Sequence, residues 1–238
     1  MDSQLFTLSK IFTERLFRIP DYQRGYAWTE PQWKDFWNDI HQIDEGSNHY
    51  TGVLTLETVP AADRKNWVED DWIIESKSYE PFYVVDGQQR LTTSIILIQA
   101  ILDSIGSDAA LNYTTVEDIK KKFIFDSKDN GISRSYIFGY DKDNPSYEFL
   151  KTKIFSEFSS SNKSEETIYT NNLETAKKLF LTKNKRITRW RRRKTLQEDN
   201  SKPAFQHIHD FGRGRCLRRF RNDEQSWKAL VVFGIAKK

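Results

Sequence analysis

The segment 29–43 carries apolar residues at helical spacing. Its four large apolar side chains recur at positions i, i+3, i+4 and i+7: Trp33, Phe36, Trp37 and Ile40. Thr29, followed three residues later by Gln32, is typical of a capping box at a helix start. The pattern predicts a helix over 29–43 whose two tryptophans belong to the core, rather than to a platform on which bases stack.

Other segments have the apolar and β-branched character of strands. The residues 16–20 predict a short strand that ends at a proline, and 50–59 predict a second strand. The longer stretch 66–85 predicts two strands joined by a polar turn. Shorter helices are expected over 116–124, 146–157 and 171–182.

The segment 82–105 is the best-defined unit of the chain. An apolar strand ends at Val85, and Asp86-Gly87 breaks it. The helix that follows has apolar residues at alternating spacings of four and three: Leu91, Ile95, Ile98, Leu102 and Ile105. The order of elements predicts an α+β chain, with a small mixed domain over 1–105 and the start of a helical domain over 106–182.

Composition narrows the class of protein. The hydrophobic fraction is 37%, but 16 Phe, 10 Tyr and 7 Trp supply the anchors that a disordered chain lacks. No uncharged apolar run is long enough to cross a bilayer, and the charged residues among the first twenty exclude a secretory signal. The single cysteine, Cys216, excludes an internal disulfide. These features predict a soluble, cytoplasmic protein.

Charge is divided unevenly along the chain. Residues 1–182 hold 20 Lys and Arg against 29 Asp and Glu, a net charge of −9, whereas residues 183–238 hold 17 against 5, a net charge of +12. A basic arm of this kind usually indicates contact with nucleic acid. A segment with this many positive charges binds DNA non-specifically, whether or not DNA binding is its function.

The sequence 86-DGQQR-90 combines a tight turn with a predicted helix start. Free backbone N–H groups and the helix dipole favour a phosphate there. Gly87 permits close backbone approach, Arg90 offers a planar fork for phosphate oxygens, and Asp86 suits a metal ion. The glutamines Gln88 and Gln89 suit a water molecule, a sugar or a base edge. Alternatively, Asp86 is an ordinary N-cap and Arg90 a surface salt-bridge partner.

A second cluster lies in the predicted loop 19-IPDYQRGYAW-28. Loops held between rigid elements often carry function. Arg24 either engages a phosphate or stacks on Tyr26 or Trp28 as a cation–π pair. Metal-site patterns are weak, because His41 and His49 lack a companion ligand and 207-HIHD-210 lacks a His-rich frame.

Three motifs occur in a characteristic order: IPDYQRGYAW, YTGVLTLE and YVVDGQQRLTT. Together they resemble the N-terminal domain of GmrSD-type, modification-dependent restriction systems, over about residues 1–182. The resemblance implies a fold similar to ParB and sulfiredoxin. It also implies that the DGQQR loop binds and hydrolyses an NTP with Mg²⁺, and that hydrolysis powers or gates cleavage of modified phage DNA by a partner HNH nuclease domain.

The resemblance assigns roles to single residues. Asp86, Gln89 and Arg90 are the implied catalytic residues, with Asp86 also the metal ligand. The implied nucleotide-binding residues are Gln23, Arg24, Gly87, Gln88 and Arg90. The expected partners are DNA and an HNH-type nuclease that this chain lacks; a second copy of the chain is left open, and no membrane is expected.

The chain departs from the family pattern after about residue 182. Codons for residues 221–238, read one nucleotide later, can encode ETMNNRGKPLSSLELLKN, which is similar to a segment expected further along in the family. We therefore interpret residues 183–238 as an out-of-frame tail that is not natively folded, on a truncated chain. Two rival functions remain: a non-catalytic DNA-binding module, and a ParB-like metal-dependent nuclease.

Overall fold

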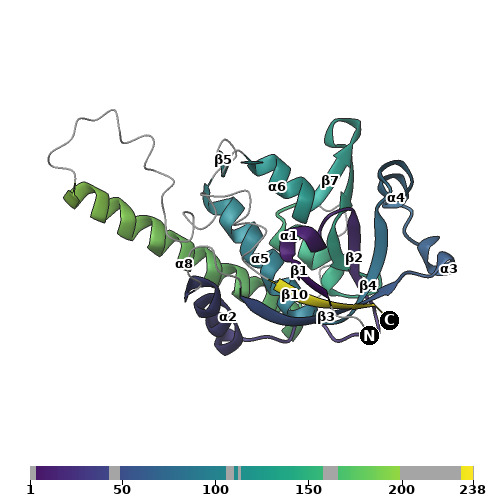
Figure 1. Cartoon of the computed structure of the whole chain (residues 1–238), viewed down its shortest axis with the longest axis horizontal. Helices are drawn as coiled ribbons and strands as arrows, with labels where there is room; N and C mark the ends of the chain where they lie inside the picture. Colours follow the sequence, from purple (N-terminus) through teal and green to yellow (C-terminus); the bar gives the residue numbers. More distant parts are fainter. Residues whose placement is uncertain are drawn as a thin grey trace.

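A six-stranded mixed sheet organises the computed structural model, which describes residues 4–42, 49–105, 110–111, 114–157, 166–198 and 232–237. From edge to edge its strands are β1 (Gln4–Thr7), β10 (Val232–Lys237), β3 (Tyr50–Thr58), β4 (Glu80–Asp86), β2 (Arg15–Ile19) and β9 (Phe138–Tyr140). Helices cover this sheet, as Figure 1 shows. The expected α+β class is confirmed.

The three central strands are the ones that the sequence predicts. β4 runs antiparallel to β3 and parallel to β2. Their core face carries alternate apolar residues, all almost fully buried: Leu54, Leu56, Phe82 and Val84. The edge strand β9 and the strand β10, which lies between β1 and β3, come from beyond residue 105, so distant parts of the chain complete the sheet.

The helix predicted over 29–43 is α2 (Glu30–Gln42), and its predicted apolar stripe is buried. Trp33 is 2% exposed and Trp37 5% exposed, which confirms that both belong to the core. At its start, Gln32 Oε1 accepts hydrogen bonds from the backbone N–H and the hydroxyl of Thr29, at 3.0 and 2.9 Å. The bond from the Thr29 N–H to the Gln32 side chain is one of the two reciprocal bonds of a capping box.

The helix α5 (Gln88–Ile105) is the centre of the fold. Every residue from Leu91 to Leu102 is buried, including polar Thr92, Thr93, Ser94 and Gln99. A helix that is buried all round must have neighbours on several sides. One of them is α8 (Ile168–Glu198), which runs alongside α5 and continues past it in Figure 1.

One prediction was wrong. The first of the two strands expected within 66–85 is replaced by a short helix, α4 (Asp71–Lys77), and another short helix, α3 (Ala61–Arg64), precedes this segment. A short apolar run does not distinguish a strand from a helical turn. The backbone N–H groups of Ile73 and Ile74 both bond to the carbonyl of Asp70, which starts the helical turn, and Ser78 ends it in a left-handed conformation.

Residues 114–157 contain more strand than expected. The helix α6 (Val116–Phe123) has the predicted place, and a hairpin follows it, with β7 (Phe125–Lys128) and β8 (Ser133–Tyr136) joined by the turn η1 (Asp129–Gly131). The helix expected over 146–157 is α7 (Ser146–Phe149) followed by a π-helical turn, η2 (Leu150–Ile154). The short elements are α1 (Leu8–Ile11), β5 (Ala110–Leu111) and β6 (Thr114–Thr115).

The basic last quarter is described in two parts, the end of α8 and the strand β10. The helix expected over 171–182 runs on to Glu198 without a break. The proposed change of reading frame stays a prediction.

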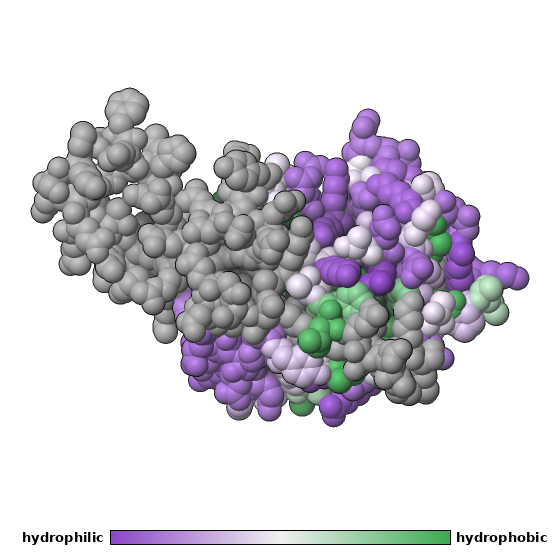
Figure 2. Space-filling view, viewed as in Figure 1, coloured by the Kyte–Doolittle hydropathy of each residue, from purple (hydrophilic) through white to green (hydrophobic). Residues whose placement is uncertain are grey.

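The described surface in Figure 2 is mainly hydrophilic. Among the described residues, no helix combines the length and the apolar character that crossing a membrane requires.

Candidate functional site

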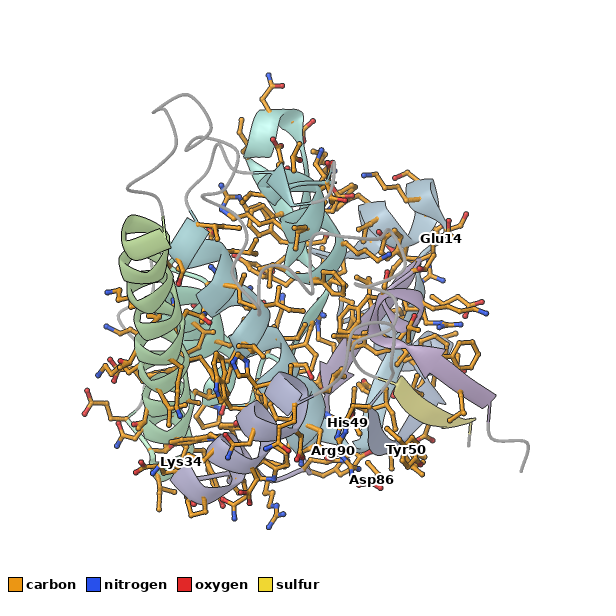
Figure 3. All side chains as sticks on the ribbon, turned by 60° about the vertical axis from the view of Figure 1, so that its left-hand side comes forward. Glu14, Lys34, His49, Tyr50, Asp86 and Arg90 are labelled. Carbon is orange, nitrogen blue, oxygen red and sulfur yellow. The ribbon has the colours of Figure 1, made fainter. Side chains whose placement is uncertain are left out.

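Three strand ends meet at one edge of the sheet. β2 and β4 are parallel, so the loop after Ile19 and the turn after Asp86 leave the sheet on the same side. β3 is antiparallel to β4, so its first residue, Tyr50, starts there too. Figure 3 shows Asp86 and Arg90 close to His49 and Tyr50 in this region. The three sequence motifs therefore converge in space.

The Asp86-Gly87 turn leaves the start of α5 open. Asp86 is exposed, and its Oδ1 accepts a hydrogen bond from the Gly87 N–H at 2.7 Å. It therefore bonds ahead of the helix instead of capping the amides of the first turn, which have no carbonyl partners within the helix. Gly87 has a φ of +85°, and a Cβ there would lie 2.8 Å from the carbonyl oxygen of Val53. Only glycine fits this turn without strain.

Arg90 lies across the first residues of β3. Its Nη2 donates a hydrogen bond to the carbonyl oxygen of Val53 at 3.0 Å. Its guanidinium packs on Gly52, where a Cβ would be 2.7 Å from Cζ. No ion pair of Arg90 exists within the described residues, so the salt-bridge alternative has no partner there. One edge of the guanidinium is held by β3, and its other N–H groups have no hydrogen-bond partner among the described residues, which leaves them available to an anion.

The two glutamines of DGQQR differ. Gln89 Oε1 accepts hydrogen bonds from the backbone N–H groups of Ala27 and Trp28 at 2.8 and 3.2 Å, and its Nε2 donates to the Gly25 carbonyl at 3.2 Å. This amide braces the loop. Gln88 Oε1, in contrast, is buried and has no hydrogen-bond partner within the described residues.

The loop 20–28 is tied to the same turn by Gln23, whose Nε2 donates to the Val85 carbonyl at 2.6 Å. The neighbouring Arg24 is exposed. It makes no cation–π contact within the described residues. There, Tyr26 stacks on Trp33 and Trp28 packs edge-on against Phe36. The cation–π alternative therefore does not hold there, and Arg24 keeps its charge at the surface.

The same loop also contacts α8. A Cβ on Gly25 would lie 2.7 Å from Cβ of Tyr169, and Asn172 Nδ2 donates to the Tyr26 carbonyl at 3.1 Å. The buried Tyr26 hydroxyl lies 2.6 Å from Thr93 Oγ1 on α5. Desolvation in this environment raises the pKa of Tyr26. The loop thus joins the start of α5 to the long helix.

A second polar cluster lies away from these motifs. The pair Arg18–Asp70 is almost fully buried, with Nη2 and Oδ2 2.5 Å apart. Beside it, Glu69 pairs with Lys151 at 3.5 Å, and burial lowers the pKa of Lys151. The cavity between these side chains is about 10 Å³, room for one water molecule. Sequence reasoning missed this cluster because its members come from three separate segments of the chain.

The histidines of the described chain have local partners. His41 stacks on Trp37, and His49 Nε2 lies 3.8 Å from an oxygen of Asp39. Within the described residues, no group of three or more His, Cys, Asp or Glu side chains is arranged to hold a metal ion. The 207–210 run lies outside those residues.

Comparison with known protein families gives a match over most of the chain. The model of the GmrSD restriction endonuclease, N-terminal domain, matches residues 3–226, which is nearly the whole chain and extends past residue 182. No curated protein matches. Restriction endonucleases act on DNA, so the match places the chain in a restriction system. This chain belongs to the GmrSD restriction endonuclease N-terminal domain family.

Proposed function

We propose that this chain binds and hydrolyses an NTP at the DGQQR turn and that this activity regulates a restriction system that acts on modified phage DNA. The observation that carries the proposal is the convergence of Arg90, the open first turn of α5 and the exposed Asp86 at one sheet edge. Membership in a restriction endonuclease family supports the wider role.

The phosphates would lie at the start of α5. The free amides of a first helical turn and the positive end of its dipole attract anions, and Gly87 lets the backbone come close to them. Arg90 adds a charged donor from the same turn of helix. Phosphoryl transfer depends mainly on positioning and on neutralising charge, which these groups supply.

The Asp86 carboxylate fits a magnesium ion that is bound jointly by the protein and by the phosphates of the substrate. Mg²⁺ is usually held by one or two carboxylates together with substrate phosphates, so a site needs no cage of protein ligands. Asp86 is exposed, and Oδ1 alone of its oxygens is bonded to Gly87. When bound, Mg²⁺ supplies neutralising charge to phosphate oxygens.

The geometry divides the remaining roles. The side-chain amides of Gln23 and Gln89 hydrogen-bond to backbone groups of the two loops. These bonds suit residues that position Asp86 and Arg24 rather than residues that contact a reacting atom. Gln88 has the unpartnered acceptor oxygen, so it suits a donor group of the ligand, such as a sugar hydroxyl. Arg24 would face the phosphates from the loop 20–28.

Cleavage of modified DNA is assigned to an HNH nuclease domain or subunit outside this chain. The chain would act on that partner through its nucleotide state. The family match supports a role in restriction. Experiments must test whether DNA cleavage depends on an NTP and on a DNA modification.

Equilibrium titration of the full chain with ATP and with GTP, with and without Mg²⁺, tests the site. We expect saturable binding that Arg90→Ala weakens at least about tenfold, since a hydrogen bond to a charged group contributes ~1.5–3 kcal/mol. Lys65→Ala, which removes an exposed cation elsewhere, should bind like the wild type. A folded chain that binds no NTP but binds modified DNA in preference to unmodified DNA would favour the DNA-binding module, because the basic arm binds any DNA non-specifically. Mg²⁺-dependent nicking that is lost in Asp86→Ala would favour the nuclease.

A further inference from the structure

The strand β3 contributes a glycine, Gly52, to the candidate site. The sequence motif YTGVLTLE does not by itself explain why a glycine is needed there. Gly52 adopts a φ of +119°, in the left-handed range that side chains rarely adopt. The three atoms nearest to a Cβ at this position would all belong to the guanidinium of Arg90, with Cζ at 2.7 Å and Nη2 at 3.2 Å. The guanidinium therefore lies directly on the backbone of residue 52.

The contact with Gly52 fixes the position of the positively charged Arg90 guanidinium. Arginine has a long side chain that loses rotamer freedom when it is fixed. Two neighbouring backbone features fix it here, the open face of Gly52 and the Val53 carbonyl that accepts from Nη2. Gly87 uses the same part of β3, since its own Cβ would meet Val53 and Leu54. The turn and the arginine thus share one backbone cradle at residues 52–54.

We propose that Gly52 is a positioning residue for the nucleotide site: it provides the seat that holds the Arg90 guanidinium where phosphate oxygens bind. This inference rests on the proposed function and adds to it a residue outside the DGQQR motif. A methyl group at position 52 would displace the far end of a flexible side chain rather than a backbone, so the variant is expected to fold with Arg90 moved off its seat.

The test compares Gly52→Ala with Gly131→Ala. Gly131 also has a positive φ, +89°, but a Cβ there would meet nothing within 4 Å. Both variants therefore carry backbone strain, and only the first one displaces Arg90. Urea unfolding of both shows whether each still folds.

The first measurement needs no nucleotide. Phenylglyoxal modifies accessible guanidinium groups, and mass spectrometry of peptides from the modified full chain gives the rate at Arg90. We expect that rate to rise several-fold in Gly52→Ala and to stay at the wild-type value in Gly131→Ala. Equal rates at Arg90 in all three proteins would overturn the proposal that Gly52 holds the Arg90 guanidinium in place.

The second measurement is titration with Mg·ATP and Mg·GTP. Gly52→Ala should weaken binding about as much as Arg90→Ala does, and the double variant should be no weaker than either single one, because both act through the same group. Gly131→Ala should bind like the wild type. Full affinity in Gly52→Ala would overturn the inference while the proposed function stands. Absence of binding in the wild type would overturn the proposed function, and with it the role of the seat in phosphate binding.

Discussion

The side-chain oxygen of Gln89 accepts a hydrogen bond from the backbone N–H of Ala27 at 2.8 Å, across 62 positions of the sequence. Through this bond, the first turn of α5 holds the loop that carries Gln23 and Arg24. The two motifs that the family resemblance brings together are therefore joined by direct contacts, in which Gln89 serves as the brace.

Removing that brace should cost stability. Gln89→Ala leaves the N–H groups of Ala27 and Trp28 without their acceptor, and an unsatisfied buried donor costs about 1–3 kcal/mol. Gln88→Ala is the matched control, because its Oε1 has no partner within the described residues, and we expect a change below about 0.5 kcal/mol. Urea unfolding monitored by tryptophan fluorescence measures both. Equal losses in the two variants would show that Gln89 does not brace the loop.

The buried pair Arg18–Asp70 should be far more sensitive than a surface pair. Asp70→Ala leaves the Arg18 charge buried without its carboxylate, a change that typically destabilises by about 3–5 kcal/mol. Lys178→Ala breaks the exposed Lys178–Glu174 pair and should cost about 0.3–0.5 kcal/mol. Thermal unfolding distinguishes these values readily. A loss in Asp70→Ala as small as that of Lys178→Ala would mean that the pair is solvated.

Asp141 predicts a pH dependence of stability. Burial is the main cause that raises the pKa of this carboxyl to about 6, opposed by Arg18 and reinforced by Asp21, Asp143 and Asp63. A folded-state pKa above the unfolded value means that the native state binds the proton more tightly. This group therefore lowers stability as pH rises from about 4 to about 6.

The neutral variant Asp141→Asn isolates this effect. Because the carboxyl is about half exposed, we expect Asp141→Asn to be more stable than the wild type by only about 1 kcal/mol at pH 7.5. The two proteins should be equally stable at pH 4, where the native carboxyl is protonated. Urea unfolding at both pH values measures the difference, and a gap that does not change with pH would contradict the raised pKa.

The reading-frame hypothesis is tested on the gene. A one-nucleotide correction near codon 183 should restore an in-frame continuation with ETMNNRGKPLSSLELLKN in place of residues 221–238. If sequencing finds no such continuation, the tail is native, and the end of α8 and β10 are parts of the fold as they stand.

The sequence predicts local elements well where an apolar period is long. The spacing of Leu91, Ile95 and Ile98 predicts the central helix, and Asp86-Gly87 marks its start. Around Ile73, by contrast, a run of a few apolar residues fits either period, so the helix α4 was predicted as a strand.

The connections within the site are harder to predict than its elements. The bonds of Gln89 to residues 25–28 and of Gln23 to Val85 join segments about 60 residues apart, and no local pattern encodes them. Gly52 carried a signal, since an isolated glycine inside a strand indicates a bulge or a close backbone approach. Which group approaches it, Arg90, became apparent only in the fold.

The most direct test of the central claim is NTP turnover by the full chain with Mg²⁺, measured for the wild type, Asp86→Ala, Arg90→Ala and the control Lys65→Ala. Each variant must first give a native unfolding transition. We predict hydrolysis by the wild type and by Lys65→Ala that is lost in both site variants. Unchanged hydrolysis in folded Asp86→Ala and Arg90→Ala, or none in the folded wild type, would contradict the account.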